Sequence, residues 1–383
     1  MKLVQNTLSR FVESGEIAGC AVRIMRNEEV AFEGSFGYAD IGKKVKMSSE
    51  DTIFAIASMS KVVTVAGIMR LYEQGLFQMW DPVSRFLPGF KNPKVAKEKP
   101  DGSYEIVDAK GEVTMRQLFT MTSGVPYGWG DTAAGRIRAE KEKEHAEQNP
   151  DRMPGNVEYS NLVGQLPLAF EPGERWMYGF SIDVLGAVIE VLSGKTLGEY
   201  LQENIFDPLG MRDTGFFVPE GKQNRIATLY HIQEGLKPEE RRFPASKPDF
   251  ESGGGGLFST VRDYSRFAQM LLHGGTLDGV RILGRKTVEL ISTDHLTPEQ
   301  RKGDSWDTQR GYGYGLGVRV MTHPELAGIN GSAGEWGWDG AFGNWFCVDP
   351  KENLTCVYLT TNLPGDHYRF VPKLMASMYA SID

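Results

Sequence analysis

The sequence predicts a mixed α/β protein of the α+β type, in which strands from both chain ends form one antiparallel sheet flanked by helices. Strand patterns occupy residues 18–40 and 314–362, and helical patterns fill the middle of the chain. Such segregation of strands and helices is typical of α+β folds. We therefore expect one unit, 1–383, with a sheet part of about 1–60 and 300–383 and an inserted, mainly helical part of about 61–299.

The individual elements follow from local patterns in chain order. An amphipathic helix begins the chain, and strand patterns at 18–27 and 29–40 flank a polar turn, as in a hairpin. Glycines stop the helical patterns that begin at 58 and 181. We expect helices at 58–75, 114–122, 181–193, 197–205, 260–273 and from about 367, and C-terminal strands at 314–320, 342–348 and 353–362. Polar stretches typical of surface excursions occupy 91–112, 131–155, 232–250 and 295–310.

Composition narrows the classes of function before any motif is considered. With a net charge of −8 at pH 7 and no basic block, the chain offers no support for a nucleic-acid partner. No uncharged apolar stretch reaches the roughly 18 to 20 residues that cross a bilayer, and the N-terminus lacks the apolar core of a signal peptide. The three cysteines lie in apolar segments without a C-x-x-C partner. We therefore expect no membrane partner, and buried, reduced thiols at Cys20, Cys347 and Cys356 in a cytoplasmic protein.

The run Ala55–Met69, A-I-A-S-M-S-K-V-V-T-V-A-G-I-M, contains one charge, Lys61, in an otherwise uncharged helical pattern. A helix that is apolar all round is usually buried, and lysine is rarely buried without a partner. Ser58 lies three positions earlier, so on a helix the two side chains share a face. An apolar helix disfavours the ammonium form, which would help Lys61 take a proton from a nucleophilic Ser58. The structural alternative is a Ser58 N-cap beside a lysine that reaches water. Ser60, the competing nucleophile, faces another side of the helix.

Histidine and metal chemistry have little support in this sequence. The histidines stand in polar, loop-like or helix-end contexts, and none is spaced from another like a pair of metal ligands. A G-x-S-x-G nucleophile elbow is absent. We therefore expect no metal site, no cofactor and six surface histidines, at His145, His231, His273, His295, His323 and His367.

Several longer phrases follow one another in an order that is far more specific than the S-x-x-K spacing. They include F-A-I-A-S-M-S-K-V-V-T, V-T-M-R-Q-L-F-T-M-T-S-G-V, F-E-P-G-E-R-W-M-Y, D-P-L-G-M-R-D-T-G-F and S-G-G-G-G-L-F-S-T-V-R-D-Y. Through them, over about residues 5 to 380, the chain resembles the serine β-lactamase and penicillin-binding-protein superfamily, in particular the branch of class C β-lactamases and their esterase relatives. The resemblance implies a β-lactamase/transpeptidase-like fold and a serine acyl-enzyme mechanism with three motifs.

The resemblance assigns catalytic roles to the first two motifs. Ser58 matches the nucleophile and Lys61 its partner lysine. Two tyrosines compete for the second motif, which relays protons. Tyr159 heads a Y-x-N sequence in a polar segment, whereas Tyr178 follows P-G-E-R-W and leads into the helical pattern, where relatives place the motif. We take Tyr178 as the motif tyrosine and Tyr159 as a loop aromatic, so that Phe180 replaces the substrate-binding asparagine.

The third motif, K-T-G or H-T-G in lactamases, corresponds to Trp338-Asp339-Gly340, similar to the W-G-G form of the esterase branch. The resemblance makes these residues part of the substrate site, with the N–H groups of Ser58 and Ala341 as the oxyanion hole. Gly340 lets the strand approach the substrate closely. Trp338 could instead be a core aromatic, and on strand alternation Asp339 could face the cleft or point away from it. No cation replaces the motif lysine, so a β-lactam carboxylate loses its main partner.

These observations lead to an expected function and its alternatives. We expect a serine hydrolase that works through an acyl-enzyme on Ser58, most simply a carboxylesterase for small neutral or hydrophobic esters, with Phe180 and Trp338 as apolar rings at the rim. Acyl transfer, a D-amino-acid peptidase and a weak class C-like β-lactamase are alternatives within the same class. A non-catalytic, penicillin-binding-like sensor is the alternative of another class. The expected partner is a small-molecule ester or amide substrate.

Overall fold

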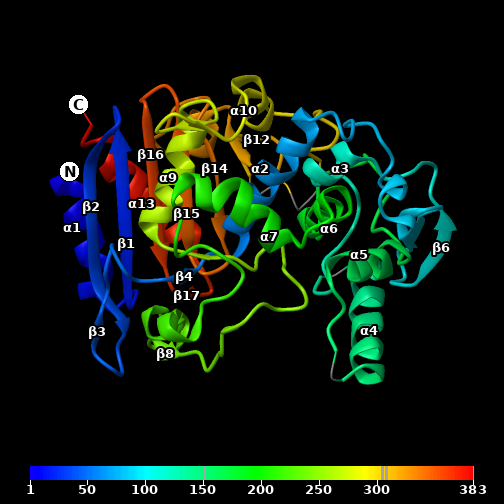
Figure 1. Cartoon of the computed structure of the whole chain (residues 1–383), viewed down its shortest axis with the longest axis horizontal. Coiled ribbons are helices and arrows are strands. Elements are labelled where there is room, and N and C mark those ends of the chain that lie inside the picture. The colour runs from blue at the N-terminus through cyan, green and yellow to red at the C-terminus, as the bar shows by residue number, and fades with distance from the viewer. Residues whose placement is uncertain (131, 151, 303–305, 307–308, 383) are drawn as a thin grey trace.

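The computed structural model describes residues 1–130, 132–150, 152–302, 306 and 309–382. Parts of two predicted surface segments, 131–155 and 295–310, therefore lie outside the described residues. Figure 1 shows a sheet with its covering helices at one end of the molecule and a mainly helical part at the other. No helix in the described ranges combines the length and the apolar character of a bilayer span.

Strands from both chain ends form one antiparallel sheet, as the sequence predicts. The N-terminal hairpin joins the C-terminal strands through β1 and β16, where Cys20 lies opposite Thr360. In spatial order, the eight strands among the described residues are β12 (Tyr312–Tyr314), β13 (Arg319–Met321), β14 (Trp336–Gly340), β15 (Asn344–Asp349), β16 (Leu354–Thr360), β1 (Gly19–Arg26), β2 (Glu29–Asp40) and β3 (Val45–Lys46).

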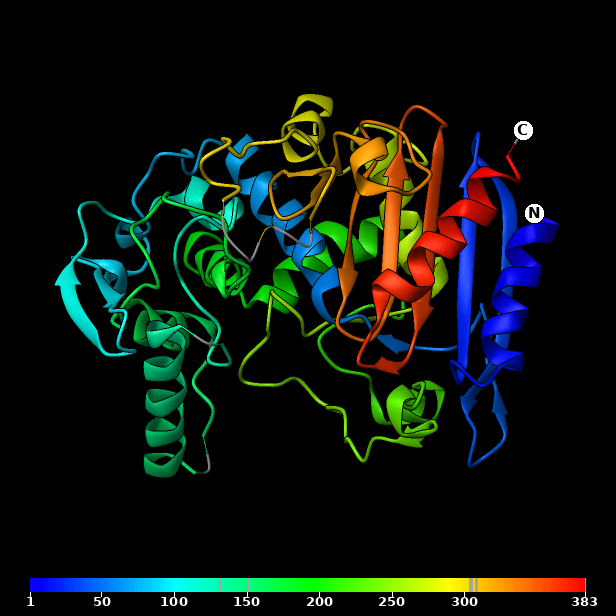
Figure 2. The same ribbon diagram turned by 180° about the vertical axis from the view of Figure 1, so that it is seen from behind.

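Helices cover both faces of this sheet. In Figure 2, α1 (Lys2–Glu13) and α13 (His367–Tyr379) lie on the near face. Val4, Leu8 and Phe11 of α1 recur at helical spacing and are buried there, because one apolar stripe faces the strands. On the other face, α9 (Val261–Leu272) buries Tyr264 and Phe267. The sheet is therefore the middle layer of three.

The helical part contains most of the remaining helices, whereas the short helix α12 (Pro324–Ala327) connects β13 to β14 in the sheet part. Helix α6 (Ser181–Ser193) has the predicted bounds and ends at Gly194, whose φ of 68° is the left-handed conformation of a glycine cap. The π-helical turn Gln202–Phe206 continues α7. The other helices are α2 (Ser60–Glu73), α3 (Met115–Phe119), α4 (Ala133–Gln148), α5 (Asn156–Gly164), α7 (Leu197–Leu201), α8 (Asp207–Leu209) and α10 (Arg285–Ile291).

Helix α2 runs through the middle of the molecule (Figure 1), and its residues 60–69 are all buried, as its sequence, uncharged except for Lys61, predicts. A 3-10 turn, η1 (Ala57–Met59), precedes it. The N-terminus of α2 lies beside β14, and Gly67 lets α7 approach: a Cβ there would lie 2.7 Å from Leu201 Cδ2. The helix therefore joins the sheet to the helical part.

One predicted surface segment and one residue assigned to a loop belong to regular secondary structure. The segment 91–112 contains the hairpin of β5 (Lys94–Glu98) and β6 (Tyr104–Asp108), at the right-hand edge of Figure 1. The prediction that Tyr159 lies in a loop is wrong, because Tyr159 belongs to α5. Smaller pairings join β4 (Phe54–Ala55) to β9 (Phe258–Ser259), β10 (Thr276–Leu277) to β11 (Val280–Arg281), and β7 (Tyr230–His231) to both β8 (Lys237–Pro238) and β17 (Asn362–Leu363).

Candidate active site

Ser58 lies in the 3-10 turn η1, immediately before α2 and not within its first α-helical turn as expected. The preceding residue, Ala57, has a φ of 44°, in the left-handed region that non-glycine residues seldom occupy. Such backbone strain is found most often at functional sites. Ser58 is half-buried, and the turn that carries it contacts β14.

Lys61 is completely buried and points to the serine. Its Nζ lies 3.1 Å from Ser58 Oγ and donates a second hydrogen bond, 2.5 Å long, to the carbonyl oxygen of Gly254. Gly254 must be a glycine here, because a Cβ would lie 2.1 Å from Asp183 Oδ2. The Asp183 carboxylate accepts the N–H of Gly254 and the hydroxyl of Ser252, so it holds the glycine loop against the lysine.

The charge on Lys61 differs from the expectation for an apolar helix. Burial by itself favours the neutral amine, but the ionisable groups of Tyr127 and Tyr178 outweigh it. Asp183 adds to their effect, so the pKa of Lys61 lies above its ordinary value. Burial thus disfavours the ammonium form as expected, but the neighbouring groups reverse the net shift, so the expectation that the pKa of Lys61 is lowered is wrong.

Ser60 is a structural residue in this geometry. Its hydroxyl donates to the carbonyl oxygen of Ala57 over 2.6 Å and accepts the N–H of Leu257 over 3.0 Å. Ser60 is fully buried, whereas Ser58 is half-buried. Of the two serines, Ser58 is the one that is partly exposed and accepts a hydrogen bond from Lys61.

The two candidate tyrosines occupy different environments. Tyr178 packs over Lys61, with 4.8 Å between its ring centroid and Nζ, and its hydroxyl lies 3.4 Å from Trp338 Nε1. Tyr159 instead donates its hydroxyl hydrogen bond to Glu142, while Arg138 donates to the same hydroxyl oxygen over 3.3 Å. Desolvation raises the pKa of Tyr159 to about 12. The structure thus brings Tyr178, and not Tyr159, to the serine and lysine.

The third-motif strand approaches the serine closely. A Cβ on Gly340 would lie 2.3 Å from the carbonyl oxygen of Ile56, two residues before Ser58, so only glycine fits. Asn344, at the start of the next strand, donates from Nδ2 to Ala55 O over 2.9 Å. Ala341 is exposed at this turn. Its N–H belongs to the peptide that follows Gly340, beside the serine turn.

Two aromatic residues that we expected at the rim are buried instead. Phe180 is 4% exposed and is enclosed by the rings of Tyr127, Tyr159 and Phe250. Trp338 is 3% exposed and stacks on Tyr178 with 5.6 Å between ring centroids. The prediction that these rings form an open apolar rim is therefore wrong: Trp338 supports the motif tyrosine, and Phe180 lies behind the site.

Asp339 forms an ion pair. Its Oδ2 lies 2.7 Å from Arg319 Nη1 on the neighbouring strand β13, and Arg319 also lies 5.5 Å from the Trp338 ring centroid. Burial alone would raise the pKa of Asp339, but the positive charge of the Arg319 guanidinium lowers it by more, so the pKa of Asp339 lies below its ordinary value. A cation is therefore present at the third motif, contrary to expectation, and Asp339 neutralises it.

The sequence reasoning also missed Tyr127, Trp129 and His367, which lie near this site. Tyr127 lies 5.7 Å from Lys61 Nζ, and Trp129 stacks on it at 4.2 Å with 75% of its own surface exposed. His367 is half-buried and bonds to the carbonyl oxygen of Gly340, a contact that its assignment as a surface histidine did not predict. One feature of the sequence could have indicated Tyr127 and Trp129: they alternate with glycines in residues 125–130, V-P-Y-G-W-G, and two aromatic residues are unusual in a simple turn.

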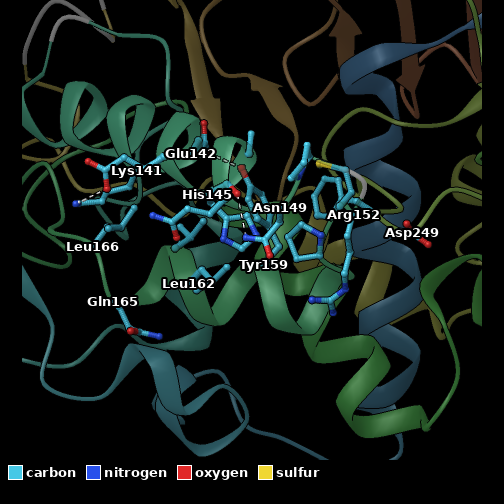
Figure 3. Close-up of a pocket in the computed structure, with 18 of the residues that line it drawn as sticks. Lys141, Glu142, His145, Asn149, Arg152, Tyr159, Leu162, Gln165, Leu166 and Asp249 are labelled. Atoms are coloured by element: carbon cyan, nitrogen blue, oxygen red, sulfur yellow. Dashed lines mark hydrogen bonds and ion pairs between the residues drawn. The ribbon is translucent and has the colours of Figure 1, made fainter.

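A cavity with a volume of about 1040 Å³ lies between α4 and α5 (Figure 3). Tyr159, Leu162 and Leu166 line it, and Phe250 closes one side. Tyr159 and Phe250 both pack on Phe180, which therefore separates the cavity from Tyr127. Within the described ranges, no group of three or more His, Cys, Asp or Glu side chains could hold a metal ion.

Comparison with known proteins agrees with this geometry. The family model described as Beta-lactamase matches residues 4–376. Protein Rv1367c of Mycobacterium tuberculosis (strain ATCC 25618 / H37Rv) is 34% identical over 369 residues, which are 94% of this chain and 90% of that protein. Esterase EstB of Burkholderia gladioli is 29% identical over 367 residues, covering 90% and 86% of the two chains.

A solved structure is similar over its whole length. EstCE1, described as a hydrolase with promiscuous acyltransferase activity, superposes with a TM-score of 0.81 at 27% identity and covers 99% of this chain and 98% of its own. The predicted β-lactamase/transpeptidase-like fold is confirmed. The chain therefore belongs to the Beta-lactamase family and is an enzyme of the serine hydrolase type.

Proposed function

We propose that this enzyme is a carboxylesterase that works through an acyl-enzyme on Ser58 and acts on small neutral or hydrophobic esters. The observation that carries the proposal is the group of three side chains at the head of α2. Lys61 Nζ lies 3.1 Å from Ser58 Oγ, and the ring of Tyr178 lies 4.8 Å from the same nitrogen. A serine hydroxyl needs a neighbouring base to become a nucleophile, and these neighbours are within reach.

The proton moves between Ser58 and Tyr178 in this mechanism. The groups around Lys61 favour its ammonium form, which can stabilise negative charge that develops on Ser58 Oγ and on Tyr178 Oη. In its deprotonated form Tyr178 would take the hydroxyl proton as Oγ attacks the ester carbonyl, and would then return that proton to the leaving alcohol. A water molecule repeats both steps on the acyl-enzyme and releases the carboxylic acid.

Backbone donors complete the site. The negative charge on the tetrahedral intermediate needs fixed N–H groups about 2.7 to 3.1 Å away. The N–H groups of Ser58 and Ala341 are the candidates, because Gly340 brings β14 against the turn that carries Ser58. Trp338, through its contact with Tyr178, takes the place of a charged third-motif residue.

A neutral ester fits the charges of this site better than an anionic substrate does. The Arg319 guanidinium already forms an ion pair with Asp339, and Lys61 Nζ donates a hydrogen bond to Ser58 Oγ, so both cations already have partners. EstB is named an esterase, which supports the same reaction here. The free, buried cysteines, Cys20, Cys347 and Cys356, support a reducing compartment such as the cytoplasm.

Acyl transfer is a second candidate, because EstCE1 is described as a hydrolase with acyltransferase activity. In that reaction an alcohol replaces water in the second half of the mechanism and receives the acyl group. Comparing ester formation with hydrolysis at rising alcohol concentration distinguishes the two activities. Peptidase and β-lactamase activity have no comparable support in the charges around the serine.

The test of the esterase proposal has two arms. A fluorophosphonate should label Ser58, with the adduct mapped by mass spectrometry, and Ser58→Ala should lose both the adduct and turnover. Short-chain p-nitrophenyl esters should then be hydrolysed with a higher kcat/KM than D-amino-acid amides or nitrocefin. An adduct on another residue would refute the nucleophile, and faster β-lactam turnover would refute the substrate class.

A further inference from the structure

His367, the first residue of α13, contacts the third motif although 309 positions separate it from Ser58. Its Nε2 lies 2.8 Å from the carbonyl oxygen of Gly340. A carbonyl oxygen can only accept a hydrogen bond, so the proton must be on Nε2, and the contact fixes the tautomer of the ring. The mechanism above gives this histidine no role.

The acceptor belongs to a particular peptide group. Gly340 O and Ala341 N–H are the two ends of one planar peptide, so fixing the oxygen fixes the direction of the N–H. Gly343 N–H also donates to Gly340 O, over 2.9 Å. The carbonyl oxygen therefore receives two hydrogen bonds, one along the turn and one from α13.

This peptide needs external support. A glycine on one side removes the side-chain contacts that would otherwise restrict rotation, and Ala341 on the other side is exposed. The chain before His367 packs on the same turn: Asn362 N–H donates to Phe342 O over 2.9 Å. His367 is the side chain by which this segment reaches the peptide itself.

We propose that His367 is a positioning residue for the oxyanion hole: its Nε2–H holds the Gly340–Ala341 peptide so that Ala341 N–H points at the developing oxyanion. The hydrogen bond also polarises the peptide, which strengthens the N–H as a donor. The inference rests on the proposed function, because Ala341 matters only if Ser58 forms a tetrahedral intermediate.

Two variants of similar length separate positioning from packing. His367→Gln keeps an N–H donor that can reach Gly340 O, whereas His367→Met fills similar space without a donor. Loss of an oxyanion donor typically costs 10²- to 10³-fold in kcat, so loss of its orientation in His367→Met should cost about 10- to 100-fold. KM should change less than about twofold, since the contact acts mainly in the transition state. His367→Gln should retain most of kcat.

Vibrational spectroscopy measures the hydrogen bonding in the oxyanion hole directly. The carbonyl stretch of a slowly deacylating acyl-enzyme should move to higher frequency in His367→Met and stay near the wild-type value in His367→Gln. His323→Ala is the matched control, because His323 is exposed and its side chain pairs with Glu325. It should change neither kcat nor the stretch.

The outcomes distinguish this proposal from the one on which it rests. If the wild-type enzyme is not labelled at Ser58, the acyl-enzyme function itself fails. If Ser58 is labelled and esters are hydrolysed, but His367→Met keeps its kcat and carbonyl frequency, the role of His367 is refuted. Equal losses in His367→Gln and His367→Met would also refute it, because packing and not the donor would then matter.

Discussion

Glu335, the residue before β14, makes the stability of this enzyme depend on pH. Its side chain is 3% exposed, and burial is the main reason why its pKa rises from 4.5 to about 8. The charge of nearby Asp349 acts in the same direction, while Arg319 partly opposes it. The carboxyl group is therefore protonated in the folded protein at neutral pH and ionised in the unfolded chain.

The sign of the effect follows from proton binding. Between pH 4.5 and about 8 the folded state holds a proton that the unfolded state has released, so the free energy of unfolding falls as the pH rises through this window. Each unit of difference between the folded and unfolded pKa changes the free energy of unfolding by about 1.4 kcal/mol, so the full decrease across this window is on the order of 5 kcal/mol. Glu335→Gln removes the ionisation and should be more stable than wild type by about 3 to 5 kcal/mol at pH 9.

Urea denaturation at pH 5, 7 and 9 measures this effect. At pH 5 the two proteins should differ by less than about 1 kcal/mol, because the amide can still accept the hydrogen bond from Tyr379. Glu325→Gln, a change at an exposed carboxylate, is the control and should leave the wild-type pH dependence unchanged. The reasoning is refuted if the Glu335→Gln curve falls with pH as steeply as the wild-type curve.

Three further predictions concern the active site. Tyr178→Phe should lower kcat for p-nitrophenyl butyrate by about 10²- to 10⁴-fold, while Tyr159→Phe stays within about threefold of wild type; the reverse result would exchange their roles. Trp129→Ala should raise KM for aromatic esters by about 3- to 10-fold, because an exposed ring stacked beside Tyr127 offers a binding surface. The control Trp80→Ala, which removes a ring packed on Arg116, should leave KM unchanged. If Trp80→Ala and Trp129→Ala raised KM equally, Trp129 would not be part of the substrate site. Ser60→Ala should retain labelling at Ser58 but lower the free energy of unfolding by about 1 to 3 kcal/mol, which a urea melt can disprove.

The parts of the fold that local sequence predicts are those with a strong period and a clear stop. Helix α6 combines an apolar run with Gly194, so its bounds agree with the prediction. Helix α5 has no such signal, and its packing involves residues distant in sequence. Gly164 lies against the Phe90 ring, where a Cβ would come within 2.6 Å. A contact of this kind cannot be predicted from the sequence of α5 alone, so Tyr159 was assigned to a loop.

The same distinction separates the predicted from the unexpected features of the site. Ser58 and Lys61 are three residues apart, so their contact depends on local geometry and could be predicted. The charge on Lys61 depends on Tyr127 and Asp183, which reach it from other elements. The burial of Phe180 likewise depends on distant rings. Local sequence therefore predicted the contact between Ser58 and Lys61, and tertiary packing decided which other groups surround them and how charged and exposed they are.

The third motif shows why this difference matters for selectivity. The sequence suggested that a neutral substrate is favoured because a cation is missing. The structure supplies a cation, Arg319, whose partner across β13 and β14 is Gly337, so its side chain reaches Asp339 two residues further along β14. A substrate carboxylate would have to displace Asp339 from Arg319, and a charge-assisted contact typically contributes about 1.5 to 3 kcal/mol. An uncharged ester avoids that competition, so the proposed preference for neutral esters rests on a cation that is already neutralised.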